Sequence, residues 1–164
     1  MRNTTEMRKG FTMIELIFVI VIIGILAAVA IPKLAATRDD AKVSNIIANA
    51  RTFKGDVAAF YTAQGASVWD LNATNKDASS VPVKNQGCAA ADVNTTLPQG
   101  LFALCDGTFE CLKINTTGNP ATIQFLQGAD STETVCAGVL SDPTIQQTIS
   151  QGQIKLGGSL VNRN

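Results

Sequence analysis

Apolar residues follow two different patterns in the first third of this chain. From Leu16 to Ile31 every residue is apolar or glycine, and with the apolar positions just ahead the run reaches about 20 residues, enough to span a bilayer as a helix. Beyond Pro32 the apolar residues recur at spacings of three and four, which predicts an amphipathic helix with one buried stripe. The stripe consists of Val43, Ile46, Ile47, Ala50, Phe53, Val57, Phe60 and Tyr61. Together the two patterns predict one helix over residues 11–63, about 80 Å long, that ends near Gln64-Gly65.

The remaining residues alternate between polar connections and short apolar segments. Residues 66–99 are rich in Asn, Thr, Ser, Ala and Asp, which indicates a long irregular connection, and its tryptophan, Trp69, is expected to pack against the core. The segments after it predict β-strands separated by turns, the second turn at residues 117–120. These segments are Leu101–Cys105, Thr108–Asn115, Thr122–Leu126 and Thr134–Val139. We therefore expect an α+β fold, in which the long helix packs on a small antiparallel sheet.

One dipeptide fixes a predicted strand register. Asp106-Gly107 is a strong signal for a two-residue hairpin turn. With that turn, Cys105 lies opposite Thr108, and Phe102 lies opposite Cys111 on the other face of the sheet. A bridge between Cys105 and Cys111 is then disfavoured.

The four cysteines are expected to form disulfides. They are Cys88, Cys105, Cys111 and Cys136, and none belongs to a Cys-x-x-Cys pair of the kind used by zinc sites. An even count in a chain that crosses a membrane indicates two bridges formed in an oxidising compartment. The hairpin register favours Cys88–Cys105 with Cys111–Cys136 over the remaining alternative, Cys88–Cys111 with Cys105–Cys136.

Charge orients the apolar segment and marks one anomalous acid. Arg2, Arg8 and Lys9 precede the run, so the positive-inside rule places the N-terminus in the cytoplasm and the C-terminal head outside the inner membrane. Glu15 lies at the edge of the apolar run, where an ionisable group is costly and is usually kept for a function. Glu15 is therefore expected to have a partner.

Composition argues against catalysis. The chain of 164 residues contains no histidine, which excludes Ser-His-Asp and Cys-His catalysis and the commonest zinc ligand sets. Its 13 basic and 13 acidic residues balance, and removal of residues 1–10 leaves ten basic and twelve acidic residues, a net charge of −2. We expect no nucleic-acid partner, no cofactor, no metal and no enzymatic activity.

The N-terminus resembles that of the type IV pilin superfamily, which includes type IV pilins and the pseudopilins of type II secretion. The resemblance rests on the run Gly10–Glu15, GFTMIE, followed by the aliphatic run that continues to Pro32. It implies that a prepilin peptidase cleaves after Gly10 and methylates the new amine of Phe11. It further implies that Glu15 acts in assembly by pairing with that amine on a neighbouring subunit. Independently of the resemblance, Pro32 lacks the N–H that would bond the carbonyl of Ala28, so a kink or loosened turn is expected near residues 28–32.

Two alternatives explain less of this segment. An ordinary secretory signal would be cut after Ala28-Val29-Ala30, but Glu15 lies inside its apolar run and Pro32 lies immediately beyond the cut. A plain membrane anchor leaves the register of Gly10–Glu15 unexplained.

The resemblance divides the chain and suggests its function. We expect a leader at residues 1–10, a transmembrane and assembly helix at 11–31, the amphipathic half of the helix at 32–63, and a globular head at 64–164. The implied function is a structural subunit of a helical filament, with other pilin-like subunits, the peptidase, an inner-membrane assembly platform and the membrane as partners. The small head, without a long adhesive extension, favours a type II secretion pseudopilin with a periplasmic head. The alternatives are a subunit of an extracellular type IV pilus, acting in adhesion, motility or DNA uptake, and a monomeric membrane-anchored binding module.

Two weaker patterns also occur in the sequence. Asn72 and Asn94 each lie in an Asp-x-Asn-x-Thr match, similar to a bacterial glycosylation acceptor, although these residue types are so plentiful here that chance explains both. Asp130, Glu133 and Asp142 lie in the region where the major pseudopilins hold calcium, but no fixed ligand spacing connects them, and solvated loop charge is the favoured interpretation.

Overall fold

The computed structural model describes residues 10–65, 69, 78–88, 100–118 and 121–157. The chain divides into two compact units, residues 1–38 and residues 39–164. Asn72 and Asn94 lie outside the described residues, as do Asn119 and Pro120 of the predicted second turn.

Helix α1 runs from Met13 to Gln64 and agrees with the predicted long helix to within two residues. Gly65 ends it with a φ of +80°, and its N–H donates to the carbonyl of Tyr61 at 2.9 Å. Glycine is favoured there because this left-handed conformation costs it no steric strain. Five members of the predicted stripe are buried, and the other three are partly buried against the core.

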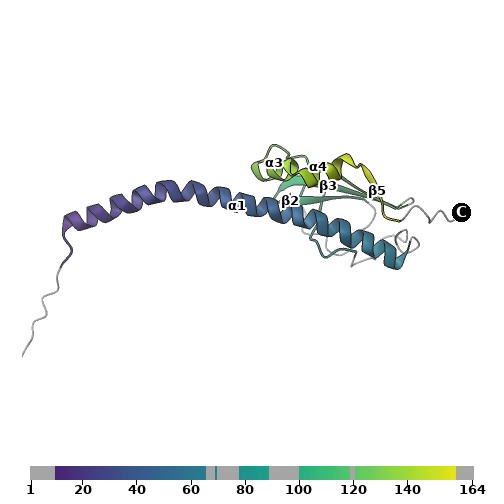
Figure 1. The fold of residues 1–164 in the computed structure, drawn as a ribbon, viewed down its shortest axis with the longest axis horizontal. Coiled ribbons are helices and arrows are strands. Elements are labelled where there is room, and N and C mark those ends of the chain that lie inside the picture. The colour runs from purple at the N-terminus through teal and green to yellow at the C-terminus, as the bar shows by residue number, and fades with distance from the viewer. Residues whose placement is uncertain (1–9, 66–68, 70–77, 89–99, 119–120, 158–164) are drawn as a thin grey trace, which may run out of the picture. The chain divides into compact units, whose positions relative to one another are not determined.

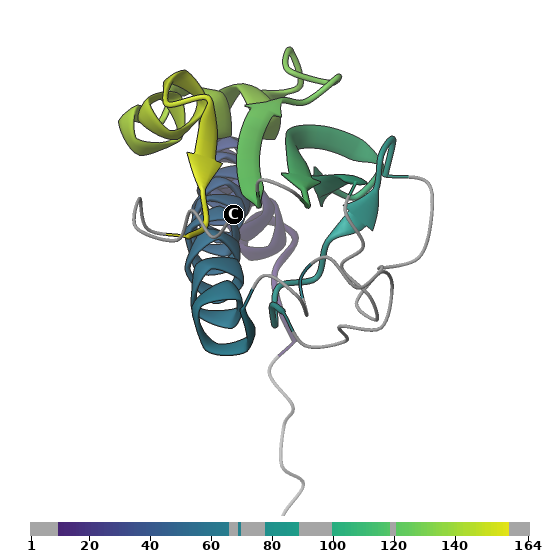
Figure 2. The same ribbon diagram turned by 90° about the vertical axis from the view of Figure 1, so that its right-hand side faces the viewer.

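The second unit contains a five-stranded antiparallel sheet in the order β1-β2-β3-β4-β5. Helices α3 and α4 lie between β4 and β5 in sequence, and the sheet and both helices lie beside the C-terminal part of α1 (Figures 1 and 2). The bounds are β1 Lys84–Asn85, β2 Gly100–Asp106, β3 Phe109–Thr117, β4 Thr122–Gln127, α3 Thr134–Ser141, α4 Pro143–Ser150 and β5 Gln153–Lys155. The predicted α+β fold class is confirmed.

The core lies between α1, the sheet and the two short helices. Its fully enclosed side chains include Phe53 and Val57 of α1, Leu112 of β3 and Phe125 of β4. Trp69 joins this core, as expected: it is buried, its Nε1 donates to the carbonyl of Thr117 at 2.9 Å, and its ring meets that of Tyr61 edge-on.

The predicted hairpin register is wrong. Asp106 pairs with Phe109, so the turn residues are Gly107 and Thr108. Gly107 has a φ of +64°, whereas Thr108 does not have a positive φ, which places glycine at the first central position, as type II′ turns require. A further shift follows between Leu104 and Cys105, where three residues of β3 oppose two of β2. Cys111 is the extra residue of this bulge.

The strand predicted over Thr134–Val139 is also wrong, because this segment forms helix α3. Val135, Cys136 and Val139 are buried, a spacing that suits one face of a helix. The Glu133 side chain accepts the N–H of Thr134 and caps the helix start. Helix α4 and strand β5 were not predicted.

Candidate assembly site

The first part of α1 and the residues just before it present a long apolar surface. Its sixteen large apolar side chains from Phe11 to Leu34 are each between 40% and 88% exposed in the isolated chain. Soluble monomers rarely expose so large an apolar patch. Among the described residues, α1 is the one helix long and apolar enough to cross a membrane.

Glu15 and Thr12 form a reciprocal cap at the start of this helix. The backbone N–H and the hydroxyl of Thr12 both donate to Glu15 Oε2, at 2.8 and 2.7 Å. The N–H of Glu15 donates to Thr12 Oγ1 at 3.3 Å. This is a capping box, which satisfies backbone donors that the first turn of a helix leaves unpaired.

The geometry gives the two oxygens of Glu15 different roles. Oε2 holds both donors of Thr12, whereas Oε1 has no hydrogen-bond partner among the described residues. The carboxylate is exposed, so Oε1 is open to a cation from outside this chain. Thr12 is the residue whose role sequence reasoning missed. The Thr-x-x-Glu spacing ahead of an apolar run was the available signal.

Gly10 and Phe11 lie just before α1, and Pro32 lies inside it. Gly10 and Phe11 precede α1 and are exposed, and a Cβ on Gly10 would meet no atom within 4 Å. The fold of this chain therefore gives no steric reason for glycine at position 10. At Pro32, which cannot donate the helical hydrogen bond, α1 nonetheless continues as helix on both sides.

The four cysteines form two disulfides in the second unit. Cys88 pairs with Cys105 and Cys111 pairs with Cys136, with Cα atoms 6.1 and 4.5 Å apart. This is the pairing that the sequence favoured, although the register used to argue for it is wrong. The second bridge fastens α3 to the bulge of β3.

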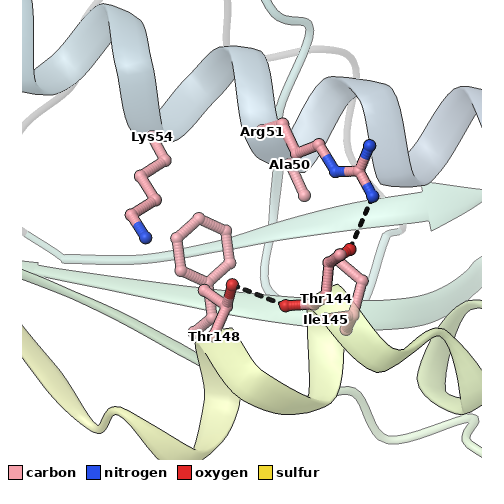
Figure 3. A pocket seen from close by; sticks show the side chains of 7 residues that line it. Ala50, Arg51, Lys54, Thr144, Ile145 and Thr148 are labelled. Carbon is pink, nitrogen blue, oxygen red and sulfur yellow. Dashed lines mark hydrogen bonds between the residues drawn. The ribbon is translucent and has the colours of Figure 1, made fainter.

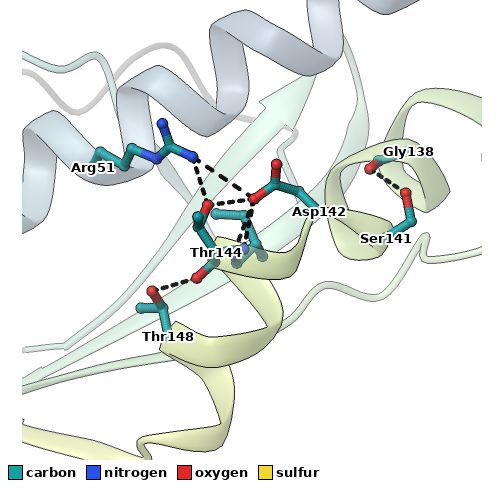
Figure 4. Close-up of polar contacts among 7 residues, drawn as sticks. Arg51, Gly138, Ser141, Asp142, Thr144 and Thr148 are labelled. Carbon is teal, nitrogen blue, oxygen red and sulfur yellow. Dashed lines mark hydrogen bonds and ion pairs between the residues drawn. The ribbon is translucent and has the colours of Figure 1, made fainter.

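The three acids weighed as calcium ligands each have a separate structural role. Asp130 Oδ2 accepts the N–H of Glu110 at 2.8 Å, and Glu133 caps α3. Asp142 caps α4 by accepting the N–H groups of Thr144 and Ile145 at 2.9 and 3.2 Å (Figure 4). In the described part of the chain, no three His, Cys, Asp or Glu side chains lie together as a metal site would need.

Hydrogen bonding lowers the pKa of Asp142. The largest cause is the hydroxyl of Thr144, which donates to Oδ1, and partial burial opposes it. The N–H groups of Ile145 and Thr144 and the charge of Arg51, 3.8 Å away, add to the lowering. The carboxylate form is thus the one the fold stabilises.

The fold and this site define a class of α+β proteins with a pilin-like architecture. The N-terminal half of one long helix is apolar and begins with an acid, and the C-terminal half packs on a small antiparallel sheet. A family model described as the prokaryotic N-terminal methylation motif matches residues 7–31. The chain is also 32% identical over 118 residues to the type IV narrow pilus major component PilA5 of Thermus thermophilus, a match that covers 71% of this chain and 95% of that protein.

Two further relatives represent both branches of the superfamily. The type II secretion system core protein G of Pseudomonas aeruginosa is 33% identical over 114 residues, covering 69% of this chain and 70% of that protein. The type IV major pilin protein PilE1 of Neisseria gonorrhoeae is 41% identical over 81 residues, covering 49% and 48%. The chain thus spans about half the length of such Neisseria pilins. No solved structure matches.

The chain belongs to the type IV pilin superfamily. This membership places it among structural subunits rather than enzymes, and both the methylation motif and the apolar helix fit membrane anchoring.

Proposed function

We propose that this chain is a structural subunit of a helical filament of like subunits, held in the bacterial inner membrane before assembly by the first part of α1. The observation that carries the proposal is the position of Glu15. Its Oε1 is open to an external cation at the start of the exposed apolar part of α1, while its Oε2 is satisfied within the chain.

Cleavage after Gly10 by a prepilin peptidase would supply that cation. Gly10 lies outside the helix, exposed and with space around its Cα, so a glycine there serves the cutting enzyme and not the fold. Cleavage leaves a cationic amine on Phe11, which the same enzyme methylates without removing its charge.

Burial among packed helices makes this amine and Glu15 depend on each other. An unpaired ion removed from water costs several kcal/mol, and a matched pair recovers much of that cost. Within one chain Thr12 already occupies Glu15 Oε2. We propose that the Phe11 amine of a neighbouring subunit binds the open side of the carboxylate, and that this contact fixes the axial register of the incoming subunit.

The test compares Glu15→Leu with Glu15→Gln. Glutamine keeps an oxygen that can accept the Thr12 donors, so it retains the helix cap but loses the charge. Both variants should insert into the membrane and be cut, with mature N-termini at Phe11 carrying one methyl group by mass spectrometry. Both should lose filaments, because the neighbour's amine is left without a counter-ion.

The yield of sheared or overexpressed filaments, relative to mature protein in the membrane, is the measurement. A normal yield from Glu15→Gln would show that the cap, and not the charge, is what assembly requires. A mature N-terminus at Ile31, as a secretory signal would give, would refute the assignment as a pilin-like subunit. Wild-type protein that stays monomeric in the membrane would favour the anchored binding module instead.

Two finer assignments remain in competition within this proposal. The pseudopilin assignment is supported by the match to core protein G over 70% of that protein, and the extracellular pilus assignment by the match to PilA5 over 95% of that protein. Electron microscopy of sheared surface filaments, with peptide mass spectrometry, distinguishes the two assignments. Long surface filaments that contain this chain would establish the pilus; loss of protein secretion on deletion, without such filaments in the wild type, would establish the pseudopilin.

A further inference from the structure

A small cavity opens between α1 and α4 in the second unit. Its volume is about 130 Å³. Figure 3 shows the side chains that line it. Ala50, Phe125 and Ile145 are lining residues that are themselves at most 3% exposed, which gives the cavity an apolar floor. Arg51 and Lys54, one turn apart on α1, supply cationic groups at its rim.

The rim carries more positive charge than its surroundings neutralise. Arg51 Nη2 donates to Thr144 Oγ1 at 2.6 Å and lies 3.8 Å from Asp142 Oδ1, an oxygen already engaged in capping α4 (Figure 4). The hydrogen bond of Lys54 Nζ is to the neutral amide oxygen of Gln151, at 3.5 Å. Among the described residues Lys54 has no carboxylate partner, so this site suits an anionic group.

The same chain presents unpartnered acids on the same helix. Among the described residues, Asp39 and Asp40 are the two carboxylates for which no hydrogen bond or ion pair occurs, and Asp40 is exposed. Asp40 and Lys54 are 14 residues apart on α1, which separates them by about 21 Å at a rise of 1.5 Å per residue. They cannot meet within one molecule.

We propose that the cavity between α1 and α4 receives Asp40 of a second copy of this chain, which pairs with Lys54 at the rim. Membrane insertion of every copy in one direction keeps the long helices parallel, and an axial stagger of about 21 Å then brings the two residues together. This neighbour differs from the one whose Phe11 amine meets Glu15, because a four-residue offset corresponds to a stagger of only about 6 Å. The apolar floor excludes water beneath the pair and so strengthens the attraction. The contact is heterologous, since each copy offers one acid and one cavity, and it can therefore repeat along a filament.

This inference rests on the proposed filament function and adds a contact to it, separate from Glu15. Lys54→Glu and Asp40→Lys should each lower filament yield at least about tenfold, because each places like charges together. The double charge swap should restore the yield to within about twofold, since it re-creates an opposite pair. Lys155→Glu on β5 is the matched control, because Lys155 is exposed and has no acidic partner among the described residues; it should assemble normally.

Cysteine cross-linking gives a readout that does not depend on yield. With Asp40→Cys and Lys54→Cys in one chain, oxidation of membranes should produce a ladder of covalent multimers on a non-reducing gel. Either single variant should produce no ladder, because its one added cysteine faces Lys54 or Asp40 of the next copy. Normal filaments from Lys54→Glu, or filaments of the double-cysteine chain without a ladder, would overturn this contact while leaving the proposed function intact. No filaments from wild type would overturn both.

Discussion

Asp142 connects two helices through a single side chain. Its N–H donates to the carbonyl of Val139 at the end of α3, and its carboxylate caps the start of α4. Because the pKa of Asp142 is lowered in the folded chain, first by the Thr144 hydroxyl, folding favours its ionised form. The residue therefore makes stability depend on pH.

We expect the destabilisation caused by Asp142→Asn to vary with pH. Asparagine keeps an acceptor for the cap but removes the charge. A carboxylate with a lowered folded pKa contributes stability above its ordinary pKa of 3.8, and that stability is lost as pH falls through the lowered folded value. Thermal unfolding of the detergent-solubilised protein should show a lower melting temperature for the variant at pH 7 and a smaller gap at pH 3. An equal gap at both values would contradict the assignment.

At the scale of elements, the turn after β4 lies directly against the backbone of β3. The N–H of Gly128 donates to the carbonyl of Cys111 at 3.0 Å, and a Cβ on Gly128 would lie 2.0 Å from the carbonyl oxygen of Glu110. The buried carboxylate of Glu110 reinforces this junction by accepting the N–H groups of Gly87 and Ala129. Backbone in this turn cannot move aside without breaking these bonds.

Gly128→Ala should therefore lower the unfolding free energy by about 1 to 3 kcal/mol, the usual cost of forcing extra atoms into a packed site. Gly100→Ala is the control, because a Cβ there meets nothing within 4 Å and the residue has no positive φ. Its effect should stay within about 0.5 kcal/mol. Urea unfolding in detergent measures the unfolding free energy of both variants. Equal effects would mean that the chain accommodates a Cβ at position 128 without loss of stability.

At the scale of the whole molecule, apolar residues serve two different purposes in the two units. In the first unit they are exposed along the helix, where a membrane or neighbouring subunits can cover them. In the second unit they form one core shared by α1, the sheet, α3 and α4. Phe53 of α1 is fully buried in that core, so the C-terminal part of α1 belongs to the head.

Phe53→Ala should destabilise the second unit by roughly 3 to 5 kcal/mol, through lost burial and the cavity that remains. Phe109→Ala, at the tip of the β2–β3 hairpin where the ring is 43% exposed, should cost far less. Limited proteolysis of membrane-inserted protein measures the difference. The head of the Phe53→Ala variant should be digested much faster than that of the Phe109→Ala control. Equal rates would show that α1 does not hold the head together.

Features that depend on neighbours along the chain could be predicted from the amino-acid sequence. The apolar run, its acid Glu15, the helix end at Gly65 and the stripe that includes Phe53 all follow from local pattern, because a helix of this length repeats its signal many times. Strands β2 to β4 were also predictable, since alternation and turn residues bracket them.

Packing between elements distant in sequence set the structure of the parts whose local signals were short or ambiguous. Thr134–Val139 has β-branched residues typical of a strand, yet the cap by Glu133, the bridge from Cys136 to β3 and the burial of Val135 and Val139 stabilise it as a helix. In that helix Gly138 lies so close to Val43 of α1 that a Cβ would come within 2.7 Å of the valine side chain. The cavity beside Lys54 is formed by α1, β4 and α4, which are distant in sequence. No pattern along the chain could therefore predict it.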